Sequence, residues 1–309
     1  MLADKLAALH SGARPQKATT VGALAELYMK ARAAYWRPKT IEHNHGIWNN
    51  YLRDEFGARN PASILPGEIE MYLSKLKAEG VSDCYCNRHM VLLKAILAFG
   101  VRNHALREMP EFPDKFSETQ YVRQGYCDSA DFHFHLIDRI PEDALWLETM
   151  VRLAYTFGFR KNELLNLRRR HVDLERHLIL LDGANTKNRM PRKIVLNPSG
   201  AAHKLLEKCC AGKSPEAYVI SRDAKGSIPI RDFRNDWDKI SAGIATGSGP
   251  GGALFFHDLR RSAIRNMAEM GIMEHDAMVL AGHLSADVHR RYRGLSESYL
   301  REISARIDK

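Results

Sequence analysis

The sequence contains few cysteines, and their spacing is not that of a metal site. They are Cys84, Cys86, Cys127, Cys209 and Cys210. No two pairs have the C-x-x-C spacing of a structural zinc site. Cys84 and Cys86 lie near His89 in the sequence, but the pattern there is helical, and helix positions two apart point in different directions. These absences favour free thiols in a reducing compartment, where disulfides are rare.

Long apolar runs are also missing. No stretch approaches the roughly 20 apolar residues that cross a bilayer. The first residues, MLADKLAALH, lack the long apolar core and cleavage signature of a secretion signal. The glycine-rich stretch 243–252 is not followed by G-K-[ST], so a phosphate-binding P-loop is unsupported and an irregular loop is expected. We therefore expect a cytoplasmic protein.

Positive charge is in excess. The chain has 46 Lys and Arg against 37 Asp and Glu, which gives a formal net charge of +9. Such a surface favours a polyanion or an acidic membrane as partner, and charge alone does not choose between them. The 309 residues exceed the length at which a single hydrophobic core usually stops growing. Two domains are therefore expected.

The first third of the chain has the pattern of a small helical bundle. Four segments carry apolar residues at helical spacing and are joined by short connections. Their expected ends are a cap at Thr20, a cap at Thr40 with a stop at Gly57, a start around Pro66 with a stop before Gly80, and a start at Ser82 or Asp83. Residues 109–116, with Pro110 and Pro113 among charged side chains, break the pattern and are the expected linker. This divides the chain into a tail (1–18), a helical domain (19–108), the linker and a second domain (117–309).

The second domain mixes helices with a few strands. Leu178–Leu181 and Lys193–Leu196 are short β-prone runs separated by a turn-rich stretch, so they predict a hairpin. The expected helices are Ala144–Phe157, Lys161–Arg168 after the turn at Gly158, further helices after Pro198, His257–Met270, His275–Ala281 and the amphipathic Tyr299–Ile307. The fold class is therefore mainly α with a small β-sheet, a helical bundle followed by an α+β domain.

Five separate patches of this domain contain residue types suited to phosphoryl transfer. They are Arg160 in GFRKNELL, Lys187 in NTKNRMPRKIVL, His257 and Arg260 in HDLRR, His283 in LAGH, and Tyr292 in HRRYRG. Taken singly, each has an ordinary explanation: a salt-bridging arginine beside Glu163, a solvated turn lysine, satisfied structural histidines, or a half-buried tyrosine. The order and spacing of the five patches make a shared role in catalysis a better explanation than five unrelated ones.

The set Arg, Lys, His-x-x-Arg, Gly-His and, nine positions later, Tyr resembles the catalytic half of the tyrosine recombinases, or phage integrases. GFRKNELLNL is similar to the family's G-x-R-x-x-E-L turn and helix, and HDLRRSAIRNMAEMG to its H-x-L-R helix. SDCYCNRHMVLLKAILAFG resembles the last helix of the family's core-binding domain, which is SAM-like. The resemblance covers roughly residues 19 to 305. It implies a core-binding bundle followed by the recombinase catalytic domain.

The resemblance also implies roles for these side chains. Tyr292 is the expected nucleophile, which stores the bond energy of the DNA backbone as a 3′-phosphotyrosyl ester, so that strands are resealed without ATP. Arg160 and Arg260 are expected to hold the non-bridging phosphate oxygens, because guanidinium groups do so in bidentate fashion. His257 would help to accept the tyrosine proton, and Lys187 would protonate the leaving 5′ oxygen. His283 would hydrogen-bond the phosphate, and Glu163 would orient Arg160. This chemistry requires neither a cofactor nor a metal ion.

The expected partner is double-stranded DNA, gripped between the two domains. Basic residues expected to contact phosphates are Arg88, Lys94, Arg290, Arg291 and Arg293, with solvated surface charge as the alternative. The resemblance implies a homo-tetramer assembled on DNA, with a monomer in solution and DNA-bending accessory proteins left open. The tail helix 299–307 would dock into a neighbouring subunit or pack within its own.

Three other functions remain to be separated from strand exchange. A topoisomerase-like enzyme of type IB would use the same tyrosine chemistry to relax supercoils as a monomer. A non-catalytic DNA-binding protein of the same fold would bind DNA without cleaving it, because a fold does not prove an activity. An unrelated phosphatase would turn over free phosphoesters without forming a covalent DNA adduct.

Overall fold

The computed structural model describes residues 20–123, 125–183, 190–244, 252–283, 285–286, 289 and 297–307. The chain divides into two compact units, the first ending at Val122 and the second beginning at Arg123. Hydrophobic side chains of the expected linker, among them Phe112 and Phe116, pack on the core of the first unit. The division between the units thus falls beyond residue 116, where the expected linker ends.

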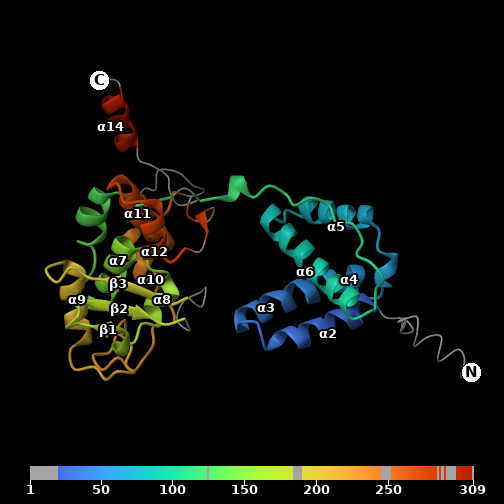
Figure 1. Cartoon of the computed structure of the whole chain (residues 1–309), viewed down its shortest axis with the longest axis horizontal. Coiled ribbons are helices and arrows are strands. Elements are labelled where there is room, and N and C mark those ends of the chain that lie inside the picture. The colour runs from blue at the N-terminus through green and yellow to red at the C-terminus, as the bar shows by residue number, and fades with distance from the viewer. Residues whose placement is uncertain are drawn as a thin grey trace, which may run out of the picture. The chain divides into compact units, whose positions relative to one another are not determined.

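The first unit is entirely helical in the part of the chain that is described (Figure 1). Its elements are α2 (Val21–Ala33), α3 (Pro38–Ile47), the π-helical turn η1 (Trp48–Leu52), α4 (Arg53–Phe56), the 3₁₀ turn η2 (Pro61–Ser63), α5 (Pro66–Ala78), α6 (Asp83–Arg102) and the 3₁₀ turn η3 (Thr119–Tyr121). The predicted bundle is confirmed.

Most of the predicted helix ends of the first unit are confirmed. Thr20 caps α2, since its hydroxyl accepts a hydrogen bond from the Ala23 amide at 3.2 Å. Pro66 occupies the first turn of α5, and Ser82 caps α6. The prediction that Thr40 caps the second helix is wrong. That helix begins at Pro38, whose fixed φ suits the first helical position.

The core of the first unit forms around α6. The predicted apolar face of this helix is buried, and Leu93 and Ile96 are 1% and 0% exposed. His89 lies on the same face and is fully buried. Its Nδ1 is 2.7 Å from the hydroxyl of Tyr72 on α5, and the rings of Tyr51 and Tyr85 contact it. The buried imidazole thus has one hydrogen-bond partner within an aromatic shell.

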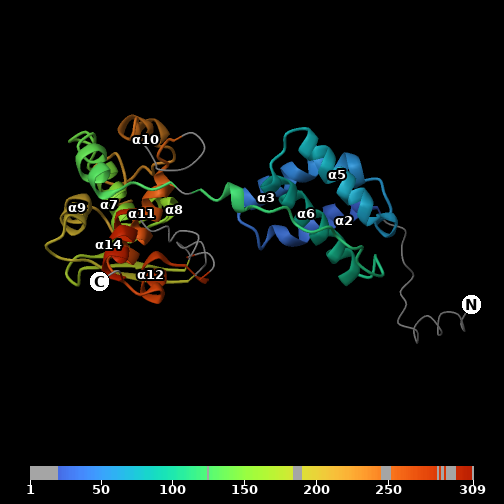
Figure 2. The same ribbon diagram turned by 90° about the horizontal axis from the view of Figure 1, so that it is seen from above.

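The second unit surrounds a small antiparallel sheet with helices (Figures 1 and 2). Its elements are the π-helical turn η4 (Asp131–Leu136), α7 (Leu145–Phe157), α8 (Lys161–Leu165), the 3₁₀ turn η5 (Arg169–His171), β1 (Val172–Asp173), β2 (Leu178–Leu181), β3 (Arg192–Val195), α9 (Ala201–Cys210), α10 (Arg234–Ser241), α11 (Phe256–Glu269), α12 (Glu274–Ala281) and α14 (Glu297–Ile307). The predicted fold class, mainly α with a small sheet, is confirmed.

The sheet has the strand order β1-β2-β3, and β2 and β3 form the predicted hairpin. Ile179 pairs with Ile194, and both side chains are fully buried. Alternation along β3 places Arg192 and Ile194 inward and Lys193 and Val195 outward. The hydrophobic core of this unit brings together residues of α7, the sheet, α9 and α11. The start of β3 therefore directs an arginine, not an apolar side chain, into the protein.

Three element predictions differ from the structure in this unit. The helix expected over residues 161–168 ends at Leu165, and the chain then enters η5 and β1. The second strand of the hairpin was expected at 193–196 and lies at Arg192–Val195. Helices were expected after Pro198, where α9 and α10 lie, but strand β1 was not predicted. Among the described residues, no helix is both long and apolar enough to span a membrane.

Candidate active site

Four of the predicted catalytic residues lie together in the second unit, although they come from three separate segments. Arg160 directly precedes α8, His257 and Arg260 lie on the first turns of α11, and His283 follows the end of α12. The guanidinium of Arg260 donates a hydrogen bond to the carbonyl of Gly158, and Arg160 Nη2 donates to the carbonyl of Gly282 at 2.8 Å. These bonds connect the three segments directly.

Two glycine turns allow this meeting. Gly158 ends α7 and Gly282 ends α12, both with φ +67°, a conformation that side-chain-bearing residues rarely adopt. A Cβ at Gly282 would lie 3.2 Å from the Arg192 side chain and 3.4 Å from that of Arg160. Gly282 therefore serves both the turn and the close approach of two arginines.

Glu163 connects the site to the hairpin. Its carboxylate is buried and accepts from the Arg160 amide at 2.9 Å and from Arg160 Nη1 at 2.8 Å. It also accepts from Arg192 Nη2 at 2.9 Å. The expected contact between Glu163 and Arg160 is thus present, and its catalytic role stays a prediction. Arg192 was not predicted; the signal available in the sequence was its inward position in the alternation of β3.

The two histidines predicted to be catalytic, His257 and His283, lie in a strongly positive environment. Burial, followed by the charges of Arg260 and Arg160, lowers the pKa of His283 to about 3. Desolvation, followed by the charges of Arg260 and Arg261, lowers the pKa of His257 to about 4. His257 is exposed at the surface of its unit, and the pKa of both rings is shifted downward, so both are neutral at neutral pH. A neutral imidazole is able to accept a proton.

Two residues that were not predicted support this region. His289 is buried, and its Nδ1 lies 3.1 Å from Nδ1 of His283. Asp258, next to His257, is buried and accepts from the Phe255 amide at 2.8 Å, which caps α11. The guanidinium of Arg123 donates to both oxygens of Asp258, at 2.7 to 2.9 Å. The helix that carries His257 and Arg260 is therefore held at its first turn.

The remaining predicted site residues fall into two groups. Lys187, Tyr292, Arg290, Arg291 and Arg293 lie outside the described residues. Arg88 and Lys94 are exposed on α6 of the first unit, where the Lys94 ammonium lies 5.4 Å from the centre of the Phe112 ring. Among the described residues, no group of three or more His, Cys, Asp or Glu side chains is arranged to hold a metal ion.

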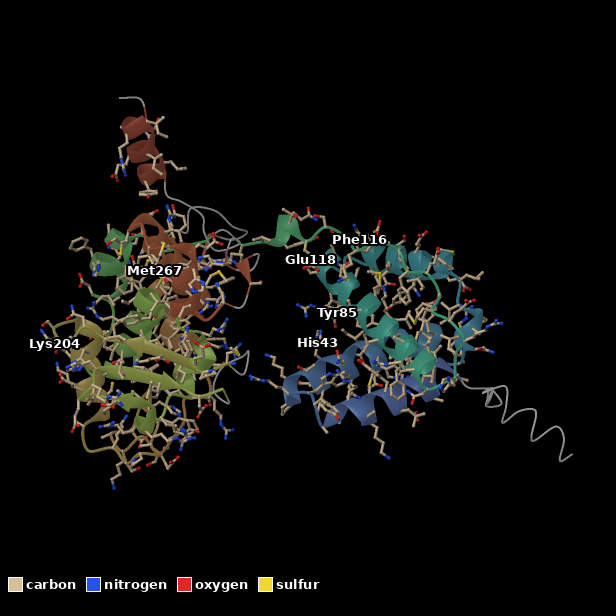
Figure 3. The ribbon with its side chains drawn as sticks, viewed as in Figure 1. His43, Tyr85, Phe116, Glu118, Lys204 and Met267 are labelled. Atoms are coloured by element: carbon tan, nitrogen blue, oxygen red, sulfur yellow. The ribbon has the colours of Figure 1, made fainter. Side chains whose placement is uncertain are left out.

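Arg88 lines a groove in the first unit. The groove has a volume of about 420 Å³, and its lining includes His43, Asn44, Val91 and Lys115. Figure 3 shows the side chains of His43 and Tyr85 close to each other, and their ring centres are 5.9 Å apart. The groove thus combines basic and amide side chains from α3, α6 and the segment after α6 with apolar ones and with the acidic Glu118.

Comparison with known proteins gives a consistent result. The model of the phage integrase family matches residues 134–298. The tyrosine recombinase XerA of Thermococcus kodakarensis is 24% identical over 233 residues, which are 75% of this chain and 78% of XerA.

Solved structures with a similar fold include the Tn1549 transposon integrase in complex with circular intermediate DNA. The TM-score is 0.68 at 15% identity, over 93% of this chain and 99% of that one. A lambda integrase tetramer bound to a Holliday junction has a TM-score of 0.67 at 17% identity, over 93% and 83% of the two chains. At these identities the likeness is one of fold.

Proposed function

The chain belongs to the phage integrase family, and from this premise we propose that it is a site-specific DNA recombinase that breaks and rejoins DNA strands through Tyr292. The observation that carries the proposal is the meeting of Arg160, Arg260, His257 and His283 from three segments of the second unit. Two guanidiniums beside two neutral imidazoles provide charge stabilisation and proton acceptance in one place, as phosphoryl transfer requires.

The first step is attack by the Tyr292 oxygen on the phosphorus of one DNA strand. The bond to the 5′ oxygen breaks as the bond to the tyrosine forms, so the 3′ end becomes covalently joined to the protein. The phenol has a pKa near 10 and must lose its proton, for which neutral His257 is the proposed acceptor. Arg160 and Arg260 hold the negative charge on the non-bridging oxygens of the transition state.

The second half of the reaction is the reverse on another strand. Lys187 protonates the 5′ oxygen that departs during cleavage and takes a proton back from the attacking 5′ hydroxyl in the reverse step, and His283 donates a hydrogen bond to the phosphate in both. A 5′ hydroxyl from the partner strand then attacks the phosphotyrosyl ester and releases Tyr292. The bond energy is kept throughout, so no ATP is required. Arginine and lysine side chains supply the charge stabilisation, and no metal ion is invoked.

We propose that the two units together grip double-stranded DNA, with the first unit as the core-binding domain. Arg88 and Lys94 are exposed there, and Arg290, Arg291 and Arg293 would add phosphate contacts from the second unit. The +9 net charge of the chain supports a polyanionic partner. Phosphate contacts of this kind set the position on DNA, and base contacts set the sequence.

We further propose that four copies assemble on DNA, with α14 of one subunit packed on the next. Helix α14 exposes Leu300 and Ile307, which are 49% and 79% accessible. A pocket of about 480 Å³ in the second unit offers an apolar lining that includes Phe132, Tyr155 and Met267. Packing of α14 within its own subunit is the alternative. Deletion of residues 297–309 distinguishes the two, because exchange between subunits predicts loss of the tetramer with the monomer still folded.

The test of the proposed function is a covalent adduct on nicked duplexes that carry candidate attachment sites. We expect an adduct that survives SDS, forms in EDTA and disappears in Tyr292→Phe, while that variant still binds the DNA. An adduct retained by Tyr292→Phe would assign the nucleophile elsewhere, with Tyr299 on α14 examined first.

The adduct assay, together with assays of supercoil relaxation and of recombinant products, separates the alternative functions. DNA that is bound but never cleaved would make the protein a non-catalytic DNA-binding member of the family. Relaxation of supercoils by the monomer without recombinant products would make it topoisomerase-like. Recombinant products that depend on Tyr292 support the recombinase.

A further inference from the structure

Arg192 occupies an unusual place for a permanently charged side chain. It opens β3 with its guanidinium turned inward, and the residue is 7% exposed. Nη2 donates to Glu163 at 2.9 Å, and Nη1 donates to the carbonyl of Leu280 at 3.0 Å. The guanidinium carbon also lies 4.6 Å from the centre of the Phe159 ring. The contacts of Arg192 thus reach both segments that flank the site.

Stability alone is a weak reason for this burial. Removing a charge from water costs several kcal/mol, and an apolar side chain of similar volume is often at least as stabilising as a buried ion pair. Burial lowers the pKa of Arg192, and the neighbouring charge of Arg160 lowers it further, while Glu163 acts in the opposite direction. Arg192 therefore lies near a second positive group, an arrangement tolerated only because Glu163 lies between them.

The hydrogen bonds of Glu163, Arg192 and Arg160 join the segments around the site in a ring. Glu163 divides its two oxygens between Arg160 and Arg192. Arg192 holds the last turn of α12 at Leu280, and Arg160 holds the residue after that helix, Gly282. Removing Arg192 would leave Glu163 with Arg160 as its remaining partner and would remove one of the contacts that hold the turn before His283 and the start of β3.

We propose that Arg192 is a positioning residue for strand cleavage, which fixes Glu163 and through it the orientation of Arg160. Because it also binds the carbonyl of Leu280, it sets the place of His283, which directly follows the turn that ends α12. Arg192 follows Lys187, the proposed general acid, by five positions, so the same contacts anchor the strand that begins five residues after it in the sequence. This inference rests on the proposed recombinase function.

The experiment compares Arg192→Met with the unchanged protein in single-turnover cleavage of a nicked duplex at saturating protein. We expect the cleavage rate to fall about 10- to 100-fold, the range typical of lost outer-shell partners, with the DNA dissociation constant unchanged within about twofold. Arg192→Lys keeps the charge but not the two-directional fork, and we expect an intermediate rate.

A second substrate separates positioning from general damage. A methylphosphonate at the cleavage site replaces one charged oxygen by a methyl group, and so removes the charge that Arg160 would neutralise. If Arg192 acts through Arg160, the deficit of Arg192→Met shrinks on this neutral substrate. An equal deficit on both substrates would overturn the proposal, as would cleavage at the unchanged rate. If Arg192→Met does not fold, the same ratio is measured on Arg192→Lys.

The matched control is Arg265→Met. Arg265 is 6% exposed on α11, donates to Glu269 at 3.0 Å and stacks on Tyr126, so it is also a buried, paired arginine of the second unit. We expect this variant to lower the melting temperature and to leave the cleavage rate of the folded protein unchanged. If the unchanged protein formed no adduct, the result would contradict the proposed function itself and not the role of Arg192 within it.

Discussion

The two units of the chain bury charged side chains to different extents. In the described part of the first unit, the buried polar residues are Asp83, Asn87 and His89, within an otherwise apolar core, and of these Asp83 is the one carboxylate. The second unit buries several charged side chains, among them Glu163, Arg192, Asp258 and Arg260. Burial of apolar side chains contributes to stability wherever it occurs. A buried charge is unfavourable unless a partner of opposite charge or a hydrogen bond compensates for the loss of water. The difference indicates that the interior of the second unit is arranged around its site as well as its fold.

The largest effect expected from this comparison is at Arg260, which is 1% exposed. Arg260→Lys keeps the charge but loses the planar fork. We expect DNA cleavage to slow about 100- to 1000-fold, as when one transition-state donor is removed, with DNA binding retained. Single-turnover rates with the nicked duplex measure this. Arg265→Lys on the same helix is the control, and an equal loss there would mean that any buried arginine of α11 matters.

The first unit should respond to core truncation in stability and not in chemistry. Leu93→Ala removes a side chain that is 1% exposed, and we expect the free energy of unfolding to fall by about 2–5 kcal/mol. Hydrogen exchange read by mass spectrometry should show the loss in peptides of residues 20–122 and not in those of the second unit. Leu27, which is 57% exposed, gives the control Leu27→Ala. Equal loss of protection in both units would show that they unfold together.

Acid should weaken both units, through different histidines. Burial lowers the pKa of His89 to about 4 and that of His283 to about 3, against 6.5 in the unfolded chain. Below pH 6.5 the unfolded chain therefore binds more protons than the folded protein. As the pH is lowered, the free energy of unfolding decreases by up to about 1.4 kcal/mol per pH unit for each histidine. The contribution of His89 should level off near pH 4.

Hydrogen exchange at several pH values between 7 and 4 measures this loss in each unit. His89→Gln removes the titrating group and should flatten the profile of the first unit alone. A slope unchanged by that substitution would assign the acid sensitivity of this unit to other groups.

The smallest expected effect is at an exposed charge of the first unit. Arg88→Ala should weaken DNA binding to a similar degree on all sequences and reduce the salt dependence of the binding constant by about one in the log–log slope. Binding measured from 50 to 200 mM salt tests this. Lys30→Ala on α2 is the control, and an identical change there would mean that Arg88 contributes only general charge.

The elements that local pattern determines were predicted well. The strand Leu178–Leu181 has its predicted bounds, and the caps at Thr20 and Ser82 are present. The Thr40 cap failed because Pro38, with its preset φ, begins the helix two residues earlier. Both signals were in the sequence, and the proline takes precedence over the threonine.

The candidate site was predicted only in part, for a physical reason. Arg160, His257, Arg260 and His283 were found from motif order, and the structure brings them together. Arg192 and Arg123 were missed because their importance lies in contacts with Glu163 and Asp258, which are 29 and 135 residues away in the chain. The local spacing of residues in the sequence does not indicate a contact partner that is so far away along the chain. The position of an arginine on the inward side of β3 was the available hint.

The attachment of Arg123 to Asp258 has a mechanical consequence. Arg123 is the first residue of the second unit, and it grips the first turn of the helix that carries His257 and Arg260. If the chain between the units were pulled, the force would therefore act on this helix through Arg123 before it acted on the hydrophobic core. If the first unit binds DNA as proposed, a pull on the chain between the units would thus act first on the helix that carries His257 and Arg260.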